Sequence, residues 1–565
     1  MLARGHTRTF GALLCHGIAA MLPFCLSLLV CNFTFSSAIY VSLLGLAYAG
    51  AVVVVLRLGC WPWLAVVSFP FCAFWLVFLL LFDCAPNLGV VLTIQKTSGA
   101  ETLEWMRHHP GLIALAFLLW LCLLLAAKRA GSQFRELPPG LVMAAGLLAL
   151  LASAACVVIN DQAGLHRRDG KVRMFDAASL TELATINDST WPLGMIRLID
   201  QARQQGHWHA SEDPALAPVR PVRQSLQVHQ APAGLTVVMV VGESQRADWL
   251  SPVNRPDLMP TLHARWKAGR LLELPNMWSV SNLTMYALPG MLTGVAPNGL
   301  MAQVRGAPSG LGYLKSVGFF TGYVSNQTNV LFAENGWDYY QRPQSVELYD
   351  QYLALQLQRI VAKPGVKRAL VLQMMGSHFH YQDRVPAQFV KQHKVMLAQA
   401  TLAHALKPPL VRQAINDYAA TIAYSAQVLE NMLQVLDQSP DPAVLIFCSD
   451  HGENLYDDQR QYYWHGGYRQ AGIPELRPAA LVAWNAAYAN QFQQPLAQLQ
   501  TIAKGPLQQQ NLLPIWLRLA GFSLTQPNPH DPFATGWRAQ TDAERAFFIS
   551  GELVKQQTLD FPGKL

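Results

Sequence analysis

Two stretches of the chain decide its fold: LTVVMVVGES at residues 235–244 and AVLIFCSDHGEN at residues 443–454. Each is a short, uninterrupted apolar run that is followed at once by small and acidic residues. A continuous apolar run of this length is typical of a strand that is buried on both faces of a parallel sheet. Because the carboxyl ends of parallel strands share one edge, we expect the polar residues after both runs to lie close together, where α/β sheets bind ligands.

The remainder of the second half alternates strand-like runs with helix-like stretches. This order predicts an α/β domain over residues 233–565, with a mostly parallel central sheet that helices cover on both faces. The further predicted strands are residues 319–325, 369–374, 479–484 and 546–550, and the clearest predicted helices are residues 411–436 and 512–520.

The first third of the chain has a different composition. The sequence is 52% hydrophobic, and the excess is concentrated in five nearly charge-free segments, each about long enough to cross a bilayer. The pattern predicts an N-terminal five-helix transmembrane domain over residues 1–160 and a connector over residues 161–232 that lies partly along the membrane surface. A cleaved signal peptide is disfavoured for the first segment, because four more apolar segments follow it. The five segments are residues 11–33, 37–56, 61–82, 111–127 and 140–159.

Basic residues in the short loops predict the orientation of these segments. If the N-terminus is cytoplasmic, Arg4, Arg57 and Arg135 lie inside with most of the other loop cations, and only Lys96 and Arg107 lie outside. An odd number of spans then exports the second half of the chain.

Charge and cysteine usage exclude some classes of protein. The formal net charge is +7, without a dense basic run or a zinc-finger spacing, so we do not expect nucleic-acid binding. Eight of the nine cysteines precede residue 160. The remaining one, Cys448, falls within a predicted strand and is expected to be a buried free thiol. The exported part therefore cannot contain an internal disulfide.

Acidic and imidazole groups after the two opening strands form a candidate metal site. Glu243 follows the first strand, and Asp450 and His451 follow the second. Thr284 lies in SNLTMYAL at residues 281–288, which indicates a loop leading into a short helix, where backbone N–H groups favour a phosphate. Two carboxylates, an imidazole and an alkoxide make a four-coordinate site. Zinc is the expected ion and manganese its main rival.

Thr284 is the predicted nucleophile. A threonine hydroxyl is a weak nucleophile unless a metal ion or a base activates it. An N-cap role for Thr284 is the alternative interpretation, and Ser279 and Ser281 are alternative nucleophiles.

Two histidines in glycine-flanked loops are further candidates. His378 comes just after the predicted strand 369–374, and His465 comes fourteen residues after His451. Both are predicted to bind phosphate or to act as acid–base groups for the entering and leaving alcohols. A second cation is the alternative. His380 is not assigned a role.

Together these strings resemble those of the phosphoethanolamine transferases of the alkaline phosphatase/sulfatase superfamily, which modify lipid A, lipopolysaccharide core or periplasmic glucans in Gram-negative bacteria. The resemblance covers the whole chain. Its strongest strings are VVGESQRAD at residues 240–248, MGSH at 375–378 and SDHGEN at 449–454, and a weaker one is SNQ at 325–327.

The resemblance implies an alkaline-phosphatase-like (sulfatase-like) fold and a multi-pass protein of the bacterial inner membrane with its catalytic domain in the periplasm. It also implies a residue that becomes phosphoethanolaminylated, Thr284. The implied zinc ligands are Glu243, Thr284, Asp450 and His451, and the implied contacts to the transferred phosphate are Asn326, His378 and His465.

The reaction implied is a two-step transfer from phosphatidylethanolamine to a lipopolysaccharide, lipid A or glucan acceptor, on a protein that also contacts membrane lipids. The chain departs from the lipid A-modifying members, which carry disulfides in this domain and a cysteine near the nucleophile. This difference favours the core-sugar or glucan branch. A glycerol-phosphate transferase of the lipoteichoic-acid-synthase type and a catalytically silent membrane sensor remain as alternatives. A sulfatase is disfavoured, because no Cys/Ser-x-Pro-x-Arg string surrounds Thr284.

Overall fold

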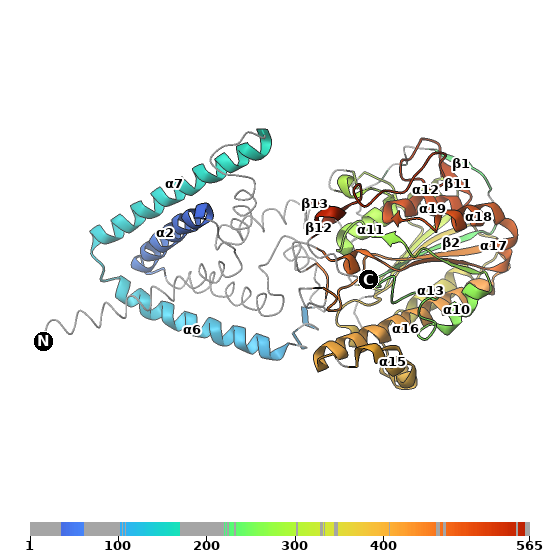
Figure 1. Cartoon of the computed structure of the whole chain (residues 1–565), viewed down its shortest axis with the longest axis horizontal. Helices are drawn as coiled ribbons and strands as arrows, with labels where there is room; N and C mark the ends of the chain where they lie inside the picture. Colours follow the sequence, from blue (N-terminus) through green and yellow to red (C-terminus); the bar gives the residue numbers. More distant parts are fainter. Residues whose placement is uncertain are drawn as a thin grey trace. The chain divides into compact units, whose positions relative to one another are not determined.

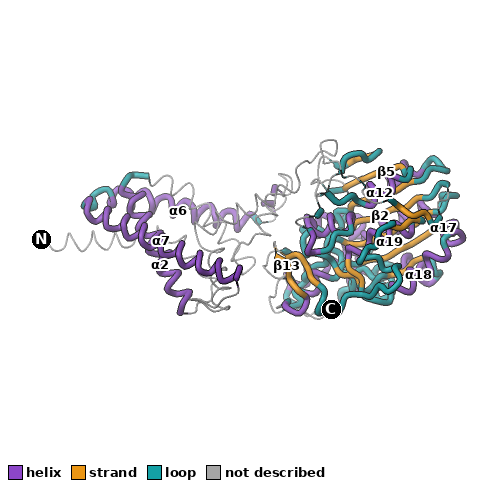
Figure 2. Tube along the Cα trace, turned by 90° about the horizontal axis from the view of Figure 1, so that it is seen from above, coloured by secondary structure: helices purple, strands orange, loops and turns teal. Residues whose placement is uncertain are grey.

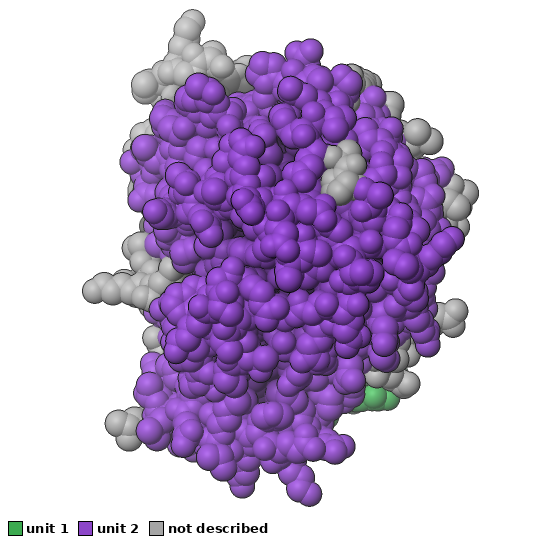
Figure 3. Space-filling view, turned by 90° about the vertical axis from the view of Figure 1, so that its right-hand side faces the viewer, with its two compact units in different colours: residues 1–92, 103–204 green, residues 93–102, 205–565 purple. Residues whose placement is uncertain are grey.

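The computed structural model describes residues 35–60, 102–169 and 220–559, apart from short gaps. The chain divides into two compact units, one of residues 1–92 and 103–204 and the other of residues 93–102 and 205–565 (Figure 3). The predicted segments 11–33 and 61–82 lie outside the described residues. The gaps are residues 104–105, 108, 221, 223–224, 231–232, 301–302, 305, 328–331, 333, 344–348, 406, 459–463, 467–470 and 550–551.

The first unit contains helices at the positions of the second, fourth and fifth apolar segments (Figures 1 and 2): α2 (Phe35–Arg57), α6 (Pro110–Phe134) and α7 (Pro139–Asp169). Helix α2 packs along α7. The two helices approach closely at Gly50, where an added Cβ would lie 2.4 Å from the Ala145 carbonyl oxygen. Among the described residues, no helix combines the length and the hydropathy needed to span a bilayer. The five-helix transmembrane domain therefore stays a prediction.

The second unit is built on a sheet whose described strands follow the order β3–β9–β8–β2–β7–β5–β6. Strands β8, β2, β7, β5 and β6 pair in parallel, and β9 runs antiparallel to both of its neighbours. The sheet is therefore mixed, although most of its pairs are parallel. The strands are β2 (Thr236–Gly242), β3 (Leu271–Glu273), β5 (Phe320–Ser325), β6 (Tyr339–Gln341), β7 (Arg368–Gln373), β8 (Ala443–Ser449) and β9 (Ala480–Trp484).

The sequence analysis predicted β2, β5, β7, β8 and β9, but it missed the short edge strands β3 and β6 and did not specify the partner of every strand. Strand β9 returns antiparallel to β8. A parallel crossover usually needs a covering helix, and the described part of the connection holds only the short 3₁₀ helix Ile473–Leu476. The predicted strand 546–550 exists as β12 (Ala546–Ile549), but it forms a separate hairpin with β13 (Glu552–Lys555). An apolar run alone does not specify the direction or the partner of a strand.

Smaller strand pairs join distant parts of the same unit. Strand β1 (Leu226–Val228) pairs with β11 (Phe522–Leu524), and β4 (Met277–Trp278) pairs with β10 (Leu507–Gln508).

Helices lie on both faces of the sheet, as predicted. On one face α16 contacts α10 and α13, and on the other α19 contacts α11, α12 and α18 (Figure 1). The predicted helices 411–436 and 512–520 are confirmed as α16 and α19. The helices of this unit are α10 (Pro260–Lys267), α11 (Thr284–Thr293), α12 (Gly310–Ser316), α13 (Gln351–Val361), α14 (Ala387–Gln392), α15 (Lys394–Ala400), α16 (Pro409–Asp437), α17 (Ala486–Gln491), α18 (Gln493–Ile502) and α19 (Leu512–Leu519).

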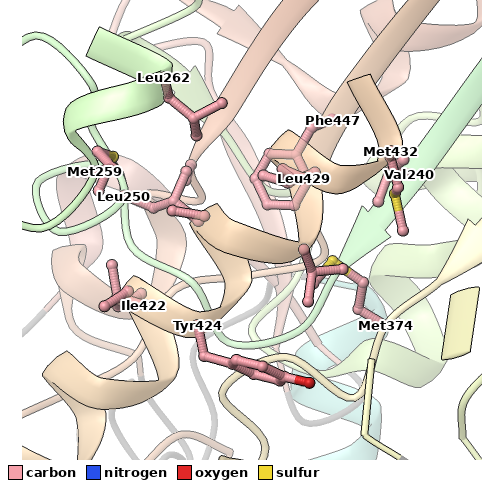
Figure 4. Packing of buried hydrophobic residues seen from close by; sticks show 14 of the residues in the cluster. Val240, Leu250, Met259, Leu262, Met374, Ile422, Tyr424, Leu429, Met432 and Phe447 are labelled. Atoms are coloured by element: carbon pink, nitrogen blue, oxygen red, sulfur yellow. The ribbon is translucent and has the colours of Figure 1, made fainter. Parts of the chain in front are cut away.

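Helix α16 packs against strands β8 and β9 of the sheet. Its buried residues Ile415, Ile422, Leu429 and Leu436 recur every seven positions, which places them on one face of a helix. Ile422 and Leu429 belong to the buried cluster that also contains Phe447 of β8, and Figure 4 shows these side chains. Burying each such side chain contributes about 1.5–3 kcal/mol. This packing gives a rigid support to the loops at the strand ends.

Cys448 is fully buried within β8 and is a free thiol, as predicted.

Candidate active site

The strand register brings the two opening motifs together. In the parallel pair of β2 and β8, Gly242 lies opposite Ser449. The residues that follow, Glu243 and Asp450, therefore leave the sheet side by side at its carboxyl edge. The Asp450 N–H donates to the Gly242 carbonyl across 3.2 Å, which extends the ladder into the site.

Four polar side chains face one another at this edge. Thr284 Oγ1 lies 3.2 Å from Glu243 Oε2 and 3.4 Å from His451 Nε2. His451 Nε2 lies 3.6 Å from Glu243 Oε1 and 3.3 Å from Asp450 Oδ2. The structure thus gathers all four residues that were assigned to the metal from the sequence.

His451 presents an acceptor nitrogen to this cluster. Its Nδ1 lies 2.7 Å from the Gly452 carbonyl oxygen, so Nδ1 carries the proton and donates it there. Burial lowers the pKa of His451, which keeps the ring neutral. A neutral imidazole whose second nitrogen is held by a carbonyl is the form that ligates metals.

Asp450 has one satisfied oxygen and one unsatisfied oxygen. Its Oδ1 accepts from the N–H groups of Ser244 (3.0 Å) and His451 (2.7 Å). Its Oδ2 is buried and receives no hydrogen bond from any described residue. A buried carboxylate oxygen without a donor is costly, and a bound cation removes that cost.

The environment of Glu243 also favours a bound cation, because its buried carboxylate lies beside a second one. Its carboxylate accepts hydrogen bonds from Ser244 Oγ and Gln327 Nε2, both at 2.9 Å. Burial and the nearby charge of Asp450 nevertheless raise the pKa of Glu243 well above its usual value. Two buried carboxylates, a neutral imidazole and a hydroxyl fit a divalent cation, and this donor set suits zinc or manganese.

His465 lies closer to the cation donors than the sequence interpretation placed it. Among the described residues, Glu243, His451 and His465 offer donor atoms that all lie within 4.8 Å of one another. The His465 Nδ1 is 3.2 Å from Glu453 Oε1, and burial lowers the pKa of His465 to about 4. His465 is therefore neutral near pH 7 and can act as a ligand or as a base.

Thr284 is the first residue of α11. Leu283 occupies the N-cap position and Thr284 follows it within the helix, so the N-cap interpretation of Thr284 is wrong. The two serines considered as nucleophiles are placed differently, since Ser281 Oγ accepts from the Leu283 N–H and Ser279 is fully buried. Of these hydroxyls, Thr284 is the one beside Glu243 and His451.

A glutamine that the sequence interpretation missed connects Thr284 to the sheet. Gln509 Nε2 donates to the carbonyl oxygens of Ser449 (2.9 Å) and Asp450 (2.6 Å). Its Oε1 accepts from the N–H of Val280, across 2.9 Å. Gln509 thus fixes the segment before α11 against the end of β8. Nothing in its local sequence distinguishes it from other glutamines.

A second missed group is a relay of buried polar side chains behind Glu243. Gln327 Nε2 donates to Glu243, and Gln327 Oε1 accepts from Gln373 Nε2 at 2.9 Å. Gln373 Oε1 in turn accepts from Tyr323 OH at 2.7 Å. The relay fixes the orientation of each amide, so the Gln327 donor always faces Glu243. Gln373 is the one polar residue of the predicted strand 369–374, and this was the available signal.

His378 lies in the loop after β7, and its backbone is held firmly. Arg384 Nε donates to the His378 carbonyl oxygen at 2.9 Å. The Ser377 N–H donates to the backbone carbonyl oxygen of Glu243, also at 2.9 Å. Among the described residues, the compact donor set does not include His378. Contact of His378 with a phosphate stays a prediction.

Asn326 supports the same loop through an aspartate. Its Nδ2 donates to Asp350 Oδ1 at 2.8 Å, and Asp350 accepts from the N–H groups of Met375 (2.7 Å) and Gly376 (2.8 Å). The structure therefore shows a supporting contact for Asn326. Its predicted contact with the phosphate is not tested by this geometry.

The loops of the two histidines pack together. Phe379 stacks on Trp464, with ring centroids 4.4 Å apart, and these residues adjoin His378 and His465. The His380 ring packs on Phe379 at 3.6 Å between centroids.

Comparison with known proteins agrees with this geometry. The sulfatase family model matches residues 236–522. The phosphoethanolamine transferase EptC of Escherichia coli O18:K1:H7 is 23% identical over 326 residues, which cover 52% of each chain. The chain thus spans about half the length of the curated relatives that it matches.

Two solved structures share the fold. The integral membrane lipooligosaccharide phosphoethanolamine transferase A of Neisseria meningitidis aligns with a TM-score of 0.63 at 17% identity, covering 91% of this chain and 95% of that one. The zinc complex of the C-terminal periplasmic domain of Escherichia coli EptC aligns with a TM-score of 0.51 at 19% identity, covering 61% and 98%. Since the family model extends over about half of the chain and includes both strand-end motifs, this protein belongs to the sulfatase family of the alkaline phosphatase superfamily.

Proposed function

We propose that this protein transfers phosphoethanolamine from phosphatidylethanolamine to a cell-envelope acceptor, a lipopolysaccharide, lipid A or glucan, through a covalent intermediate on Thr284. The observation that carries the proposal is the position of Thr284 Oγ1, within 3.5 Å of both Glu243 and His451 at the start of a helix. The similarity to enzymes named phosphoethanolamine transferases supports the choice of the transferred group.

Glu243, Thr284, Asp450 and His451 would hold a zinc ion, with His465 adjacent. When bound, the ion supplies positive charge that lowers the pKa of the threonine hydroxyl and offsets charge on the phosphate oxygens. The protein's own contribution is orientation. The Gly452 carbonyl fixes the tautomer of His451, and Gln327 and Ser244 hold the Glu243 carboxylate.

The reaction proceeds in two displacements. In the first, Thr284 Oγ1 forms a bond to phosphorus, the bond from phosphorus to the diacylglycerol oxygen breaks, and that oxygen gains the proton that Thr284 loses. In the second, an acceptor hydroxyl or phosphate oxygen attacks phosphorus. The bond to Oγ1 then breaks, and Oγ1 regains a proton, the one that the acceptor group loses, so that the threonine hydroxyl is restored.

His465 is the group we assign to proton transfer in the second step. Its pKa, lowered to about 4 by burial, leaves it neutral and able to accept a proton near pH 7. Glu453 Oε1, 3.2 Å from Nδ1, holds the ring in orientation.

The first turn of α11 and two further side chains bind the phosphate in this proposal. The N–H groups at a helix start have no intrahelical partners, and they favour an anion there. His378 and Asn326 complete the phosphate site from the neighbouring strand ends.

We further propose that the protein is a multi-pass protein of the bacterial inner membrane, with the catalytic unit in the periplasm. The five apolar segments and the asymmetry of basic loop residues support this location, as does a relative described as an integral membrane protein. Because Cys448 is the sole cysteine of the second half, a core-sugar or glucan acceptor is favoured over lipid A.

Mass spectrometry of the purified protein after incubation with phosphatidylethanolamine tests the proposal. We expect a phosphoethanolamine adduct on the peptide that contains Thr284. Thr284→Ala should remove the adduct and reduce transfer about a thousandfold or more, while Thr284→Ser should retain part of both. A glycerol-phosphate adduct from phosphatidylglycerol would instead support the glycerol-phosphate transferase. Absence of transfer and of bound metal would support the silent sensor.

A further inference from the structure

The described residues of the segment 386–412, which omit position 406, expose several large apolar side chains. This segment contains α14, α15 and the first turn of α16, which contact one another in sequence, and α15 lies at the edge of the unit (Figure 1). Val395, Leu402 and Leu410 are 71%, 70% and 83% exposed, and Val390 is 39% exposed. Apolar side chains left in solvent on neighbouring elements indicate a contact surface.

The exposed side chains stand on a well-anchored backbone. Leu397 and Thr401 are buried on the inner side of the segment. Arg255 Nη2 donates to the Ala400 carbonyl oxygen at 3.0 Å, and Trp249 stacks on His404 with ring centroids 6.0 Å apart. The exposure is therefore a property of the folded unit.

The same segment is basic throughout. Lys391, Lys394, Lys407 and Arg412 are exposed, and the sequence has no acidic residue from position 384 to position 416. Positive charge interleaved with apolar side chains complements a surface that is both anionic and apolar.

We propose that residues 386–412 are a docking surface for a bilayer containing anionic phospholipid. Val395, Leu402 and Leu410 would enter the headgroup region, and the lysines and Arg412 would bind lipid phosphates. This is the composition of interfacial, membrane-surface helices. A protein partner is disfavoured, because the cores of protein interfaces are depleted of lysine.

Docking at this surface would bear on the candidate active site. The 3₁₀ helix Tyr381–Arg384 joins the segment to the His378 loop, and it also packs on α16. Arg384 donates to the carbonyl oxygens of His378 and Phe379. The docking surface is therefore connected, through Arg384, to the loop that carries His378, a residue proposed to bind the phosphate. The docking itself does not depend on the transfer reaction.

The test is photo-crosslinking of the full chain in nanodiscs. A benzophenone amino acid replaces Leu402 or Leu410 in separate variants, and Val228, which is 58% exposed on β1, is the matched control position. The discs contain phosphatidylethanolamine with either phosphatidylglycerol or phosphatidylcholine, and lipid adducts are counted by mass spectrometry.

We expect several-fold more lipid adduct at positions 402 and 410 than at position 228, and more in the discs that contain phosphatidylglycerol. Replacing Lys391, Lys394, Lys407 and Arg412 together with glutamine should remove the preference for phosphatidylglycerol. Equal labelling at all three positions, or adducts to protein alone, would overturn the proposal. The readout is a lipid adduct, so its failure leaves the Thr284 chemistry standing. A missing Thr284 adduct likewise leaves the docking result standing.

Discussion

Two buried aspartates near the same edge of the sheet are satisfied in opposite ways. Asp350 receives three hydrogen bonds, from the Asn326 amide and from the N–H groups of Met375 and Gly376, and both of its oxygens have a donor. Asp450 receives its hydrogen bonds at Oδ1, and no described residue donates to its Oδ2. Both side chains are almost completely inaccessible to solvent.

The difference separates a structural carboxylate from a ligand-binding one. Where the protein supplies donors to both oxygens, as at Asp350, the carboxylate holds a loop in place. Where one oxygen is left without a donor beside a second carboxylate and a neutral imidazole, as at Asp450, we propose that a cation completes the site. The following predictions test that distinction.

The largest effects, on metal binding and on the free energy of unfolding, are expected from removing the charges of Asp450 and Asp350 in turn. Asp450→Asn should weaken metal binding by more than the roughly 10- to 100-fold typical of residues that only support a ligand. In chelator its stability should be unchanged or raised, because the charge that opposes Glu243 is gone. Asp350→Asn should keep the metal but lose about 2–4 kcal/mol of unfolding free energy, because its amide meets backbone N–H donors. Metal analysis and urea unfolding measure the two quantities.

A reversed pattern would contradict the distinction. If Asp450→Asn destabilised the metal-free protein as much as Asp350→Asn does, Asp450 would be a structural carboxylate as well.

The relay behind Glu243 should have the next largest effect. Gln327→Met removes the donor at 2.9 Å from Glu243 Oε2, and metal affinity should fall about 10- to 100-fold. Gln356→Met is the matched control, because Gln356 is also buried, on α13, and bonds to Tyr339 OH. Metal titration with a competing chelator measures both variants. Equal losses in the two would mean that the relay contributes general stability only.

In the metal-free protein, stability should fall as pH rises. The pKa of Glu243 is raised in the folded state above its ordinary value of 4.5, so folding is favoured by a proton on this group. That contribution is complete below about pH 4.5 and is lost as pH rises through the raised pKa, with a slope of up to about 1.4 kcal/mol per pH unit.

Urea unfolding in chelator over a pH series checks this slope. Glu243→Gln cannot bind the proton and serves as the reference. Added zinc should remove the difference between the two proteins. Parallel pH curves without metal would show that Glu243 does not titrate differently on folding.

The smallest effect is expected at an exposed carboxylate. Arg538 and two groups of Thr541 hydrogen-bond Glu544 and lower its pKa to about 2. The contribution of Glu544 to folding stability is present above about pH 4.5 and is lost as pH falls toward 2. Because the pair is solvent-exposed, Glu544→Gln should barely change the thermal midpoint, and less still in high salt. A large shift in the thermal midpoint would mean that solvent exposure does not predict how much a carboxylate contributes to the folding stability of this protein.

Local sequence patterns predicted five strands of the central sheet, the helices α16 and α19 and most residues of the candidate site, but they missed the edge strands β3 and β6. The runs ending at Glu243 and Asp450 are apolar throughout, and α16 repeats its apolar residues at helical spacing, so both elements are specified by local composition. Parallel strands end at a shared edge, and this geometric rule was enough to place Glu243 beside Asp450 and His451. The choice of Thr284 followed from the helix that begins there and from the family resemblance.

How these parts meet depends on contacts between distant segments of the chain. The antiparallel direction of β9, the separate hairpin of β12 and the approach of His465 to the cation donors depend on packing between residues far apart in the chain. The same holds for Gln509 and the glutamine relay, whose role lies in hydrogen bonds to distant segments. Asp350 and Asp450 are the same residue type in sequence. Their difference lies in which backbone N–H groups the fold brings to each oxygen, and no local pattern encodes that.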